Sequence, residues 1–111
     1  MGIAEYGILD AVAMAELVRR REVTPRELVD EAIARIERVN PQLNAVVERL
    51  FEQARTAAGA SLPDGPLRGV PFVTKNLLAP IAGVPIDGGS RFFHGHVAAH
   101  DSTLVSRYRR A

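Results

Sequence analysis

The chain has 111 residues, of which 47% are hydrophobic, 24% charged and 5% aromatic, and its formal net charge is +1. This length fits one domain of ordinary size, and the composition excludes wholesale disorder. The near balance of charge argues against a nucleic-acid or membrane surface that depends on global charge, and the absence of cysteine excludes disulfides, thiolate zinc sites and a cysteine nucleophile.

The first half of the chain has the pattern of helices. Asp10 can cap a first helix that runs to about Arg21. A second helix is predicted from Thr24, because Thr24 and Glu27 can form a capping box and Pro25 suits the first helical position. The first helix has a loose apolar face, formed by Val12, Met14, Ala15, Leu17 and Val18.

The second helix carries one apolar stripe, because its apolar residues recur at steps of three and four. The stripe consists of Leu28, Val29, Ala32, Ile33, Ile36 and Val39. We expect the helix to stop at Asn40-Pro41, because the residue before a proline is pushed out of the helical conformation. A third helix is predicted over residues 48–58.

The composition changes after the third predicted helix, where seven of the nine glycines and five of the seven prolines are found. Residues 69–75 predict a strand, with Pro71 at its start or on a sheet edge. Residues 76–100 show little periodicity and predict long loops. Asp101 or Ser102 is then expected to cap a final helix.

A single predicted strand cannot make a sheet, and 25 residues without regular structure are unusual in a small domain. Both features indicate that this chain lacks structural partners. We therefore expect the isolated chain to be only marginally stable.

The most informative segment is Gly65–Leu77, which reads GPLRGVPFVTKNL. It places Lys75 at the end of an apolar predicted strand, where the chain turns into a loop. Apolar surroundings disfavour the charged form of a lysine, and a neutral lysine can act as a base. The residues alone favour a strand-end lysine that reaches solvent, and a catalytic base is the alternative for Lys75.

This segment resembles the amidase signature family, whose members show G-P-L-x-G-V-P-x-x-x-K followed by Asp or Asn. The flanking elements are similar in order, so the resemblance covers residues 9–111. It implies an α/β fold, a mixed sheet flanked by helices, of which this chain is an N-terminal fragment. The expected partial amidase domain over residues 1–111 has three parts: N-terminal helices at 10–58, the lysine strand and loops at 65–100, and a truncated helix at 102–111.

The resemblance also implies a Ser–Ser–Lys mechanism, in which a nucleophilic serine attacks an amide carbonyl and a second serine relays its proton to the lysine. Lys75 matches the lysine, whereas nothing in the chain matches the segment that carries the two serines. The complete enzyme would act on a small-molecule amide without a cofactor or metal. The 111-residue chain alone is expected to be inactive. Asn76 stands where Asp is the commoner residue of the family.

Several other residues are weaker site candidates. Ser90 follows Gly89 but lacks the flanks of a nucleophile elbow, so a turn-forming or backbone-binding role is favoured. A metal site is the less favoured interpretation of a short polar run that contains His94, His96, His100 and Asp101. DNA binding by the second helix is disfavoured because acidic side chains crowd it.

Two other functions stay open. The chain could be a non-catalytic helical interaction or structural module that keeps only this region, or part of the amidase subunit of a tRNA-dependent amidotransferase. No secretory signal and no membrane-spanning run is recognisable, so a cytoplasmic protein is expected, with no membrane or nucleic-acid partner. The residues do not predict an oligomeric state.

Overall fold

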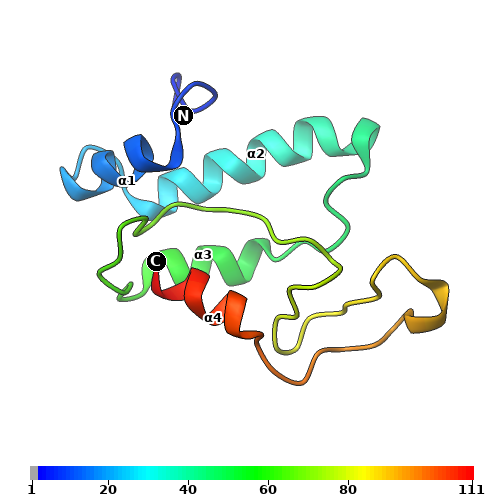
Figure 1. Ribbon diagram of the computed structural model, residues 1–111. Helices are drawn as coiled ribbons and strands as arrows, with labels where there is room; N and C mark the ends of the chain where they lie inside the picture. Colours follow the sequence, from blue (N-terminus) through cyan, green and yellow to red (C-terminus); the bar gives the residue numbers. More distant parts are fainter. Residues whose placement is uncertain (1–2) are drawn as a thin grey trace. The chain divides into compact units, whose positions relative to one another are not determined.

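The computed structural model describes residues 3–111, in which four α-helices and one short 3-10 helix follow one another (Figure 1). The helices are α1 (Ala11–Arg19), α2 (Pro25–Leu43), α3 (Phe51–Gly59), the 3-10 helix η1 (Arg91–Phe93) and α4 (Thr103–Arg110). The chain divides into two units, Met1–Pro71 and Phe72–Ala111. The first unit contains α1 to α3, and the second contains η1 and α4.

The predicted starts of the first two helices are confirmed, whereas α3 begins at Phe51, three residues later than predicted, and its N-cap Leu50 makes no side-chain hydrogen bond. The Asp10 side chain accepts a hydrogen bond from the Ala13 N–H at 2.8 Å and caps α1. At α2 the Thr24 hydroxyl accepts from the Glu27 N–H at 3.2 Å, and the Glu27 carboxylate accepts from the Thr24 N–H at 2.8 Å. These bonds satisfy backbone donors that have no partner inside a helix.

The predicted end of the second helix is wrong, because α2 continues through Pro41 to Leu43. Asn40 remains part of the helix and is buried. Its side chain makes three hydrogen bonds to the backbone of Ala45 and Val46. The helix ends instead at Asn44, which adopts the left-handed conformation (φ 49°). The restriction before proline is a preference, and these side-chain bonds outweigh it.

The first unit buries part of each predicted apolar face. Met14 and Ala15 of α1 and Leu28, Val29 and Ile33 of α2 are buried, and Leu28 is fully so. Burial of a leucine contributes about 1.5–3 kcal/mol. Two other residues of the predicted apolar faces are exposed over large fractions of their side chains: Val12 (69%) and Val39 (43%).

Helix α3 packs against α2 within the first unit. A salt bridge joins the two helices, with the Arg55 Nε atom 2.8 Å from an oxygen of Asp30. Arg55 holds the pKa of the Asp30 carboxyl below its ordinary value through this hydrogen bond, and Arg26 acts in the same direction.

The strand predicted at residues 69–75 is not formed. In the described part of the chain, the only β pairing is an isolated antiparallel bridge between Pro85 and Val97. A strand needs a neighbouring strand to satisfy its backbone groups, and residues 69–75 have none here. The α/β expectation is thus met only by the helices, which are the only regular elements that the described residues form.

The second unit is organised around the start of α4. The Ser102 hydroxyl accepts from the Val105 N–H at 3.2 Å, which confirms the predicted cap. Asp101 accepts a hydrogen bond from the Ala82 N–H at 2.9 Å, and the Ser102 N–H donates to the Pro80 carbonyl at 3.0 Å. These contacts tie the loop at residues 80–82 to the helix, whose Val105 is buried.

Among residues 3–111, no helix combines the length and the apolar character needed to cross a bilayer.

Candidate functional site

The glycine-rich part of the candidate segment folds against the helices of the first unit. Gly69 has φ +84°, a conformation that side chains rarely adopt. A Cβ atom at this position would lie 2.9 Å from Cγ of Pro25 and 3.3 Å from Cγ1 of Val18. The Val70 N–H closes a turn by donating to the Leu67 carbonyl at 3.1 Å. The motif therefore needs glycine here for both its backbone conformation and its close packing.

Lys75 lies six residues further on, in the second unit, and is the only lysine of the chain. Its side chain is exposed, so the apolar surroundings expected for a basic lysine are not present in these residues. The Leu77 N–H donates to the Lys75 carbonyl at 2.8 Å and forms a tight three-residue turn around Asn76. Lys75 thus sits at the point where the chain reverses, rather than at the end of a paired strand.

Asn76 is bound to Asp87 by two reciprocal hydrogen bonds. Its Nδ2 atom donates to Oδ1 of Asp87 at 3.1 Å, and its Oδ1 atom accepts from the Asp87 N–H at 3.0 Å. The same Asp87 oxygen accepts from the Gly89 N–H at 3.0 Å. The residue after Lys75 is therefore fixed to the turn that begins at Asp87.

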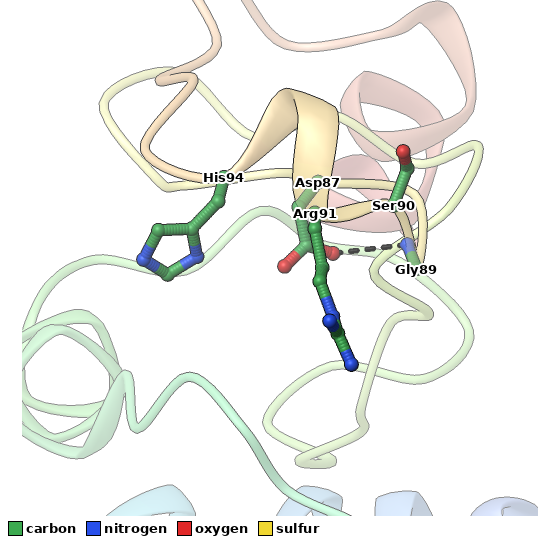
Figure 2. A pocket seen from close by; sticks show the side chains of 5 residues that line it. All are labelled: Asp87, Gly89, Ser90, Arg91 and His94. Atoms are coloured by element: carbon green, nitrogen blue, oxygen red, sulfur yellow. Dashed lines mark hydrogen bonds between the residues drawn. The ribbon is translucent and has the colours of Figure 1, made fainter.

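This turn lines an open depression of about 410 Å³, shown in Figure 2. The lining residues are Asp87, Gly89, Ser90, Arg91 and His94. The Ser90 hydroxyl accepts from the Phe92 N–H at 3.3 Å and begins η1, which confirms the backbone-binding role. In Figure 2 the Ser90 hydroxyl points away from the Arg91 guanidinium.

A second depression of about 590 Å³ begins two residues after Lys75. Most of its lining is apolar: Leu77, Leu78, Pro80, Ile86, Ala98 and Ala99, together with His96, His100 and Ser102. The three histidines of the chain are exposed. Within residues 3–111, no three His, Cys, Asp or Glu side chains are grouped closely enough to hold a metal ion.

Asp101 precedes Ser102, one of the lining residues, and its carboxylate has two partners. The Ala82 N–H donates to it at 2.9 Å, and the Nε atom of Arg109 lies 3.0 Å from its second oxygen. The backbone hydrogen bond and the nearby guanidinium hold the pKa of Asp101 below its ordinary value. Asp101 is a candidate metal ligand by sequence, but in the structure it anchors the loop before α4.

Sequence reasoning missed the part that Asp87 plays. The Asp-Gly-Gly-Ser run at residues 87–90 is a turn signal, and an aspartate in a turn often accepts from the backbone two residues on. That signal predicts the Gly89 contact. It does not predict the contact with Asn76, which lies 11 residues away.

Comparison with known proteins gives a consistent set of similarities. The profile of the Amidase family matches residues 27–111. The 6-aminohexanoate-cyclic-dimer hydrolase of Pseudomonas sp. (strain NK87) is 41% identical over 106 residues, which are 92% of this chain and 21% of that protein. A glutamyl-tRNA(Gln) amidotransferase subunit of Halorhodospira halophila is 38% identical over 96 residues, covering 81% of this chain and 20% of that protein.

The solved structures show the same relationship. A structure of 6-aminohexanoate cyclic dimer hydrolase superposes with a TM-score of 0.87 and 37% identity, over 98% of this chain and 22% of that chain. The chain therefore spans about one fifth of the length of the relatives that it matches.

Proposed function

This chain belongs to the amidase signature family, and from that premise we propose that it supplies Lys75 as the catalytic base of an enzyme that hydrolyses a carbon–nitrogen amide bond. The observation that carries the proposal is the Gly65–Leu77 segment, which has the spacing of the family's lysine motif. Lys75 is the only lysine of these 111 residues, so no other residue of this segment can take the role of the lysine.

The proposed chemistry is acyl transfer in two steps. A serine hydroxyl attacks the amide carbonyl, and its proton passes through a second serine to the neutral amine of Lys75. The amine nitrogen of the substrate leaves with a proton, and water then releases the acid from the acyl-enzyme. The bond that breaks in the substrate is the amide C–N bond, and no oxidation or reduction occurs.

The proposed nucleophile and relay serines lie outside these 111 residues. Two of the chain's serines are occupied locally, since Ser90 accepts from the Phe92 N–H and Ser102 caps α4. A base without a nucleophile has nothing to activate. We therefore expect the 111-residue chain by itself to be inactive.

The proposed substrate is a small-molecule amide. The hydrolase from Pseudomonas is named for the cyclic dimer of 6-aminohexanoate, and its identity with this chain extends over 92% of the chain. The substrate of the present protein is proposed only to the level of an amide, because this chain corresponds to one fifth of that enzyme.

The proposal is tested by a chimera in which this chain replaces the matching fifth of the Pseudomonas hydrolase. We expect the chimera to hydrolyse the cyclic dimer, and Lys75→Ala to lower kcat by about 10²–10⁴-fold, the usual contribution of a general base. Arg68→Ala is the matched control, because Arg68 occupies the variable position of the motif, and it should retain activity.

Two results would overturn the proposal. One is a Lys75→Ala chimera that keeps its activity. The other is a folded parent chimera without activity, measured as release of the linear product.

A second candidate is the amidase component of a tRNA-dependent amidotransferase, favoured by the 38% identity with the Halorhodospira protein. To distinguish the two functions, this chain replaces the matching segment of the Halorhodospira protein in a second chimera. The function of whichever chimera keeps its activity is favoured. A non-catalytic module is the remaining alternative. Amide hydrolysis by the chimera that disappears in Lys75→Ala would exclude it.

A further inference from the structure

The side chain of Asn76, which follows Lys75, forms hydrogen bonds through both its oxygen and its nitrogen. The Asn76 amide uses both of its polar atoms on Asp87, donating from Nδ2 at 3.1 Å and accepting at Oδ1 from the Asp87 N–H at 3.0 Å. Both side chains are partly buried at this contact. A pair that is satisfied in both directions fixes orientation as well as distance.

Asp87 extends this network into the turn that lines the open depression of Figure 2. Its Oδ1 atom also accepts from the Gly89 N–H at 3.0 Å, and its carbonyl accepts from the Ser90 N–H at 2.9 Å. Asp87 therefore joins the Asn76 side chain to a closed turn. The backbone on both sides of Asn76 is also constrained, because the Leu77 N–H donates to the Lys75 carbonyl at 2.8 Å.

The contact requires an amide at position 76. A carboxylate there could still accept from the Asp87 N–H, but it has no proton to donate to the Asp87 side chain. Two carboxylate oxygens would then face each other at the 3.1 Å that now separates Nδ2 from Oδ1. Like charges at this distance favour protonation of one of the two carboxyl groups.

We propose that Asn76 and Asp87 form a positioning pair for Lys75, in which the reciprocal hydrogen bonds hold the Lys75–Leu77 turn against the Asp87–Ser90 turn. The catalytic meaning of the pair rests on the proposed function of Lys75. The pair itself is a property of these 111 residues and is tested without any reaction.

The experiment compares four forms of the 111-residue chain: the parent, Asn76→Asp, Asp87→Asn and the double variant. The thermal midpoint is followed by circular dichroism at pH 7 and pH 4, and amide hydrogen exchange is followed by NMR. Leu77 and Gly89 are the reporting amides, because they donate to the Lys75 carbonyl and to Asp87.

We expect Asn76→Asp to lower the midpoint by about 5 °C at pH 7, and the protection of both amides to fall about tenfold. The loss should shrink at pH 4, where one carboxyl of the pair is protonated and can donate. Asp87→Asn keeps an oxygen that accepts both bonds, so it should resemble the parent. In the Asp87→Asn background, Asn76→Asp should lower the thermal midpoint by less, because the repulsion between two charges is gone.

Arg91 and His94 line the same depression as Asp87, and Lys75 is adjacent to Asn76 in the chain. These groups are present in every form of the protein. The parent at each pH is therefore the reference.

The pair is overturned if Asn76→Asp matches the parent at pH 7, or if its loss is independent of both pH and the residue at position 87. A variant that is unfolded at pH 7 and refolds at pH 4 supports the pair, and one unfolded at both pH values overturns it. In the chimera, Asn76→Asp should lower kcat more than it raises KM. If the pair is verified while Lys75→Ala keeps activity, the proposed function fails and the pair stands.

Discussion

Asn40 links the end of α2 to the chain that follows it. It is the one polar side chain of residues 3–111 that is buried, with 6% of its surface exposed. Its Oδ1 atom accepts from the Ala45 and Val46 N–H groups at 2.9 and 2.8 Å, and its Nδ2 atom donates to the Val46 carbonyl at 2.9 Å. The side chain therefore replaces the partners that the backbone loses after α2.

We predict that Asn40→Ala lowers the free energy of unfolding by about 1–3 kcal/mol, because partly buried backbone groups lose their partners. The measurement is urea denaturation followed by the helical signal in circular dichroism. Arg38→Ala is the control, since Arg38 is exposed on the same helix and should change stability by less than about 0.5 kcal/mol. Equal stability of the two variants would contradict this account of Asn40.

Residue identity predicts some of these roles and leaves others hidden. Lys75 stands out from its motif, and Ser90 from its place in a turn-forming run. The hydrogen bonds of Asn76 and Asn40 form only because the fold brings residues 87 and 46 close to them. The sequence shows that these side chains can form hydrogen bonds, but not with which partners.

Helices α1, α2 and α4 begin where the sequence indicates, because each is capped by a side chain that binds a backbone N–H three residues on. Helix α3 has no such cap and begins three residues later than predicted. The Thr24 and Glu27 groups satisfy each other, and the hydrogen bonds from Thr24 hold the pKa of Glu27 below its ordinary value. Helix ends are harder to predict. Pro41 has the pattern of a stop, but α2 runs on to Leu43 because contacts beyond the helix hold Asn40 in place.

Helix α4 is attached to the preceding loop through a carboxylate whose pKa is lowered. The ionised form of Asp101 is the one that accepts from the Ala82 N–H and faces Arg109. Because its pKa is lower in the folded chain, Asp101 stabilises the fold above its ordinary titration range. That stabilisation is lost as the pH falls through the folded pKa.

We predict that the thermal midpoint of the chain falls between about pH 5 and pH 2, and that Asp101→Asn makes this fall shallower. The asparagine oxygen can still accept from the Ala82 N–H, so the two proteins should converge at low pH. Asp64→Asn is the matched control, because the Asp64 side chain is 99% exposed and its nearest guanidinium nitrogen is 4.0 Å away. An unchanged slope in Asp101→Asn would refute the prediction.

At the scale of the whole molecule, many large apolar side chains face solvent. The exposed fractions reach 86% for Ile8 in the first unit, and 79% for Leu78 and 87% for Phe92 in the second. Exposed apolar surface of this kind is typical of regions that bind other protein segments. It agrees with the similarity to about one fifth of longer relatives.

We predict that the 111-residue chain binds the dye ANS at pH 7 and that its thermal midpoint lies close to room temperature. Each exposed apolar group adds to dye binding, so Phe92→Ser together with Leu78→Ser should reduce the fluorescence. Glu48→Ser, at an exposed polar position, should leave it unchanged. A parent chain that binds no dye and melts cooperatively at high temperature would contradict this prediction.

The sequence by itself determined the family, the position of the lysine motif and the starts of the three helices that have side-chain caps. These features depend on residue types at short spacing, as in the cap of Asp10 and the capping box of Thr24. The tertiary structure alone decided the pairing of Asn76 with Asp87 and of Ala82 with Asp101, which join residues 11 and 19 positions apart. It also decided that residues 69–75 form no strand, because a strand exists only when a second segment lies beside it to exchange backbone hydrogen bonds.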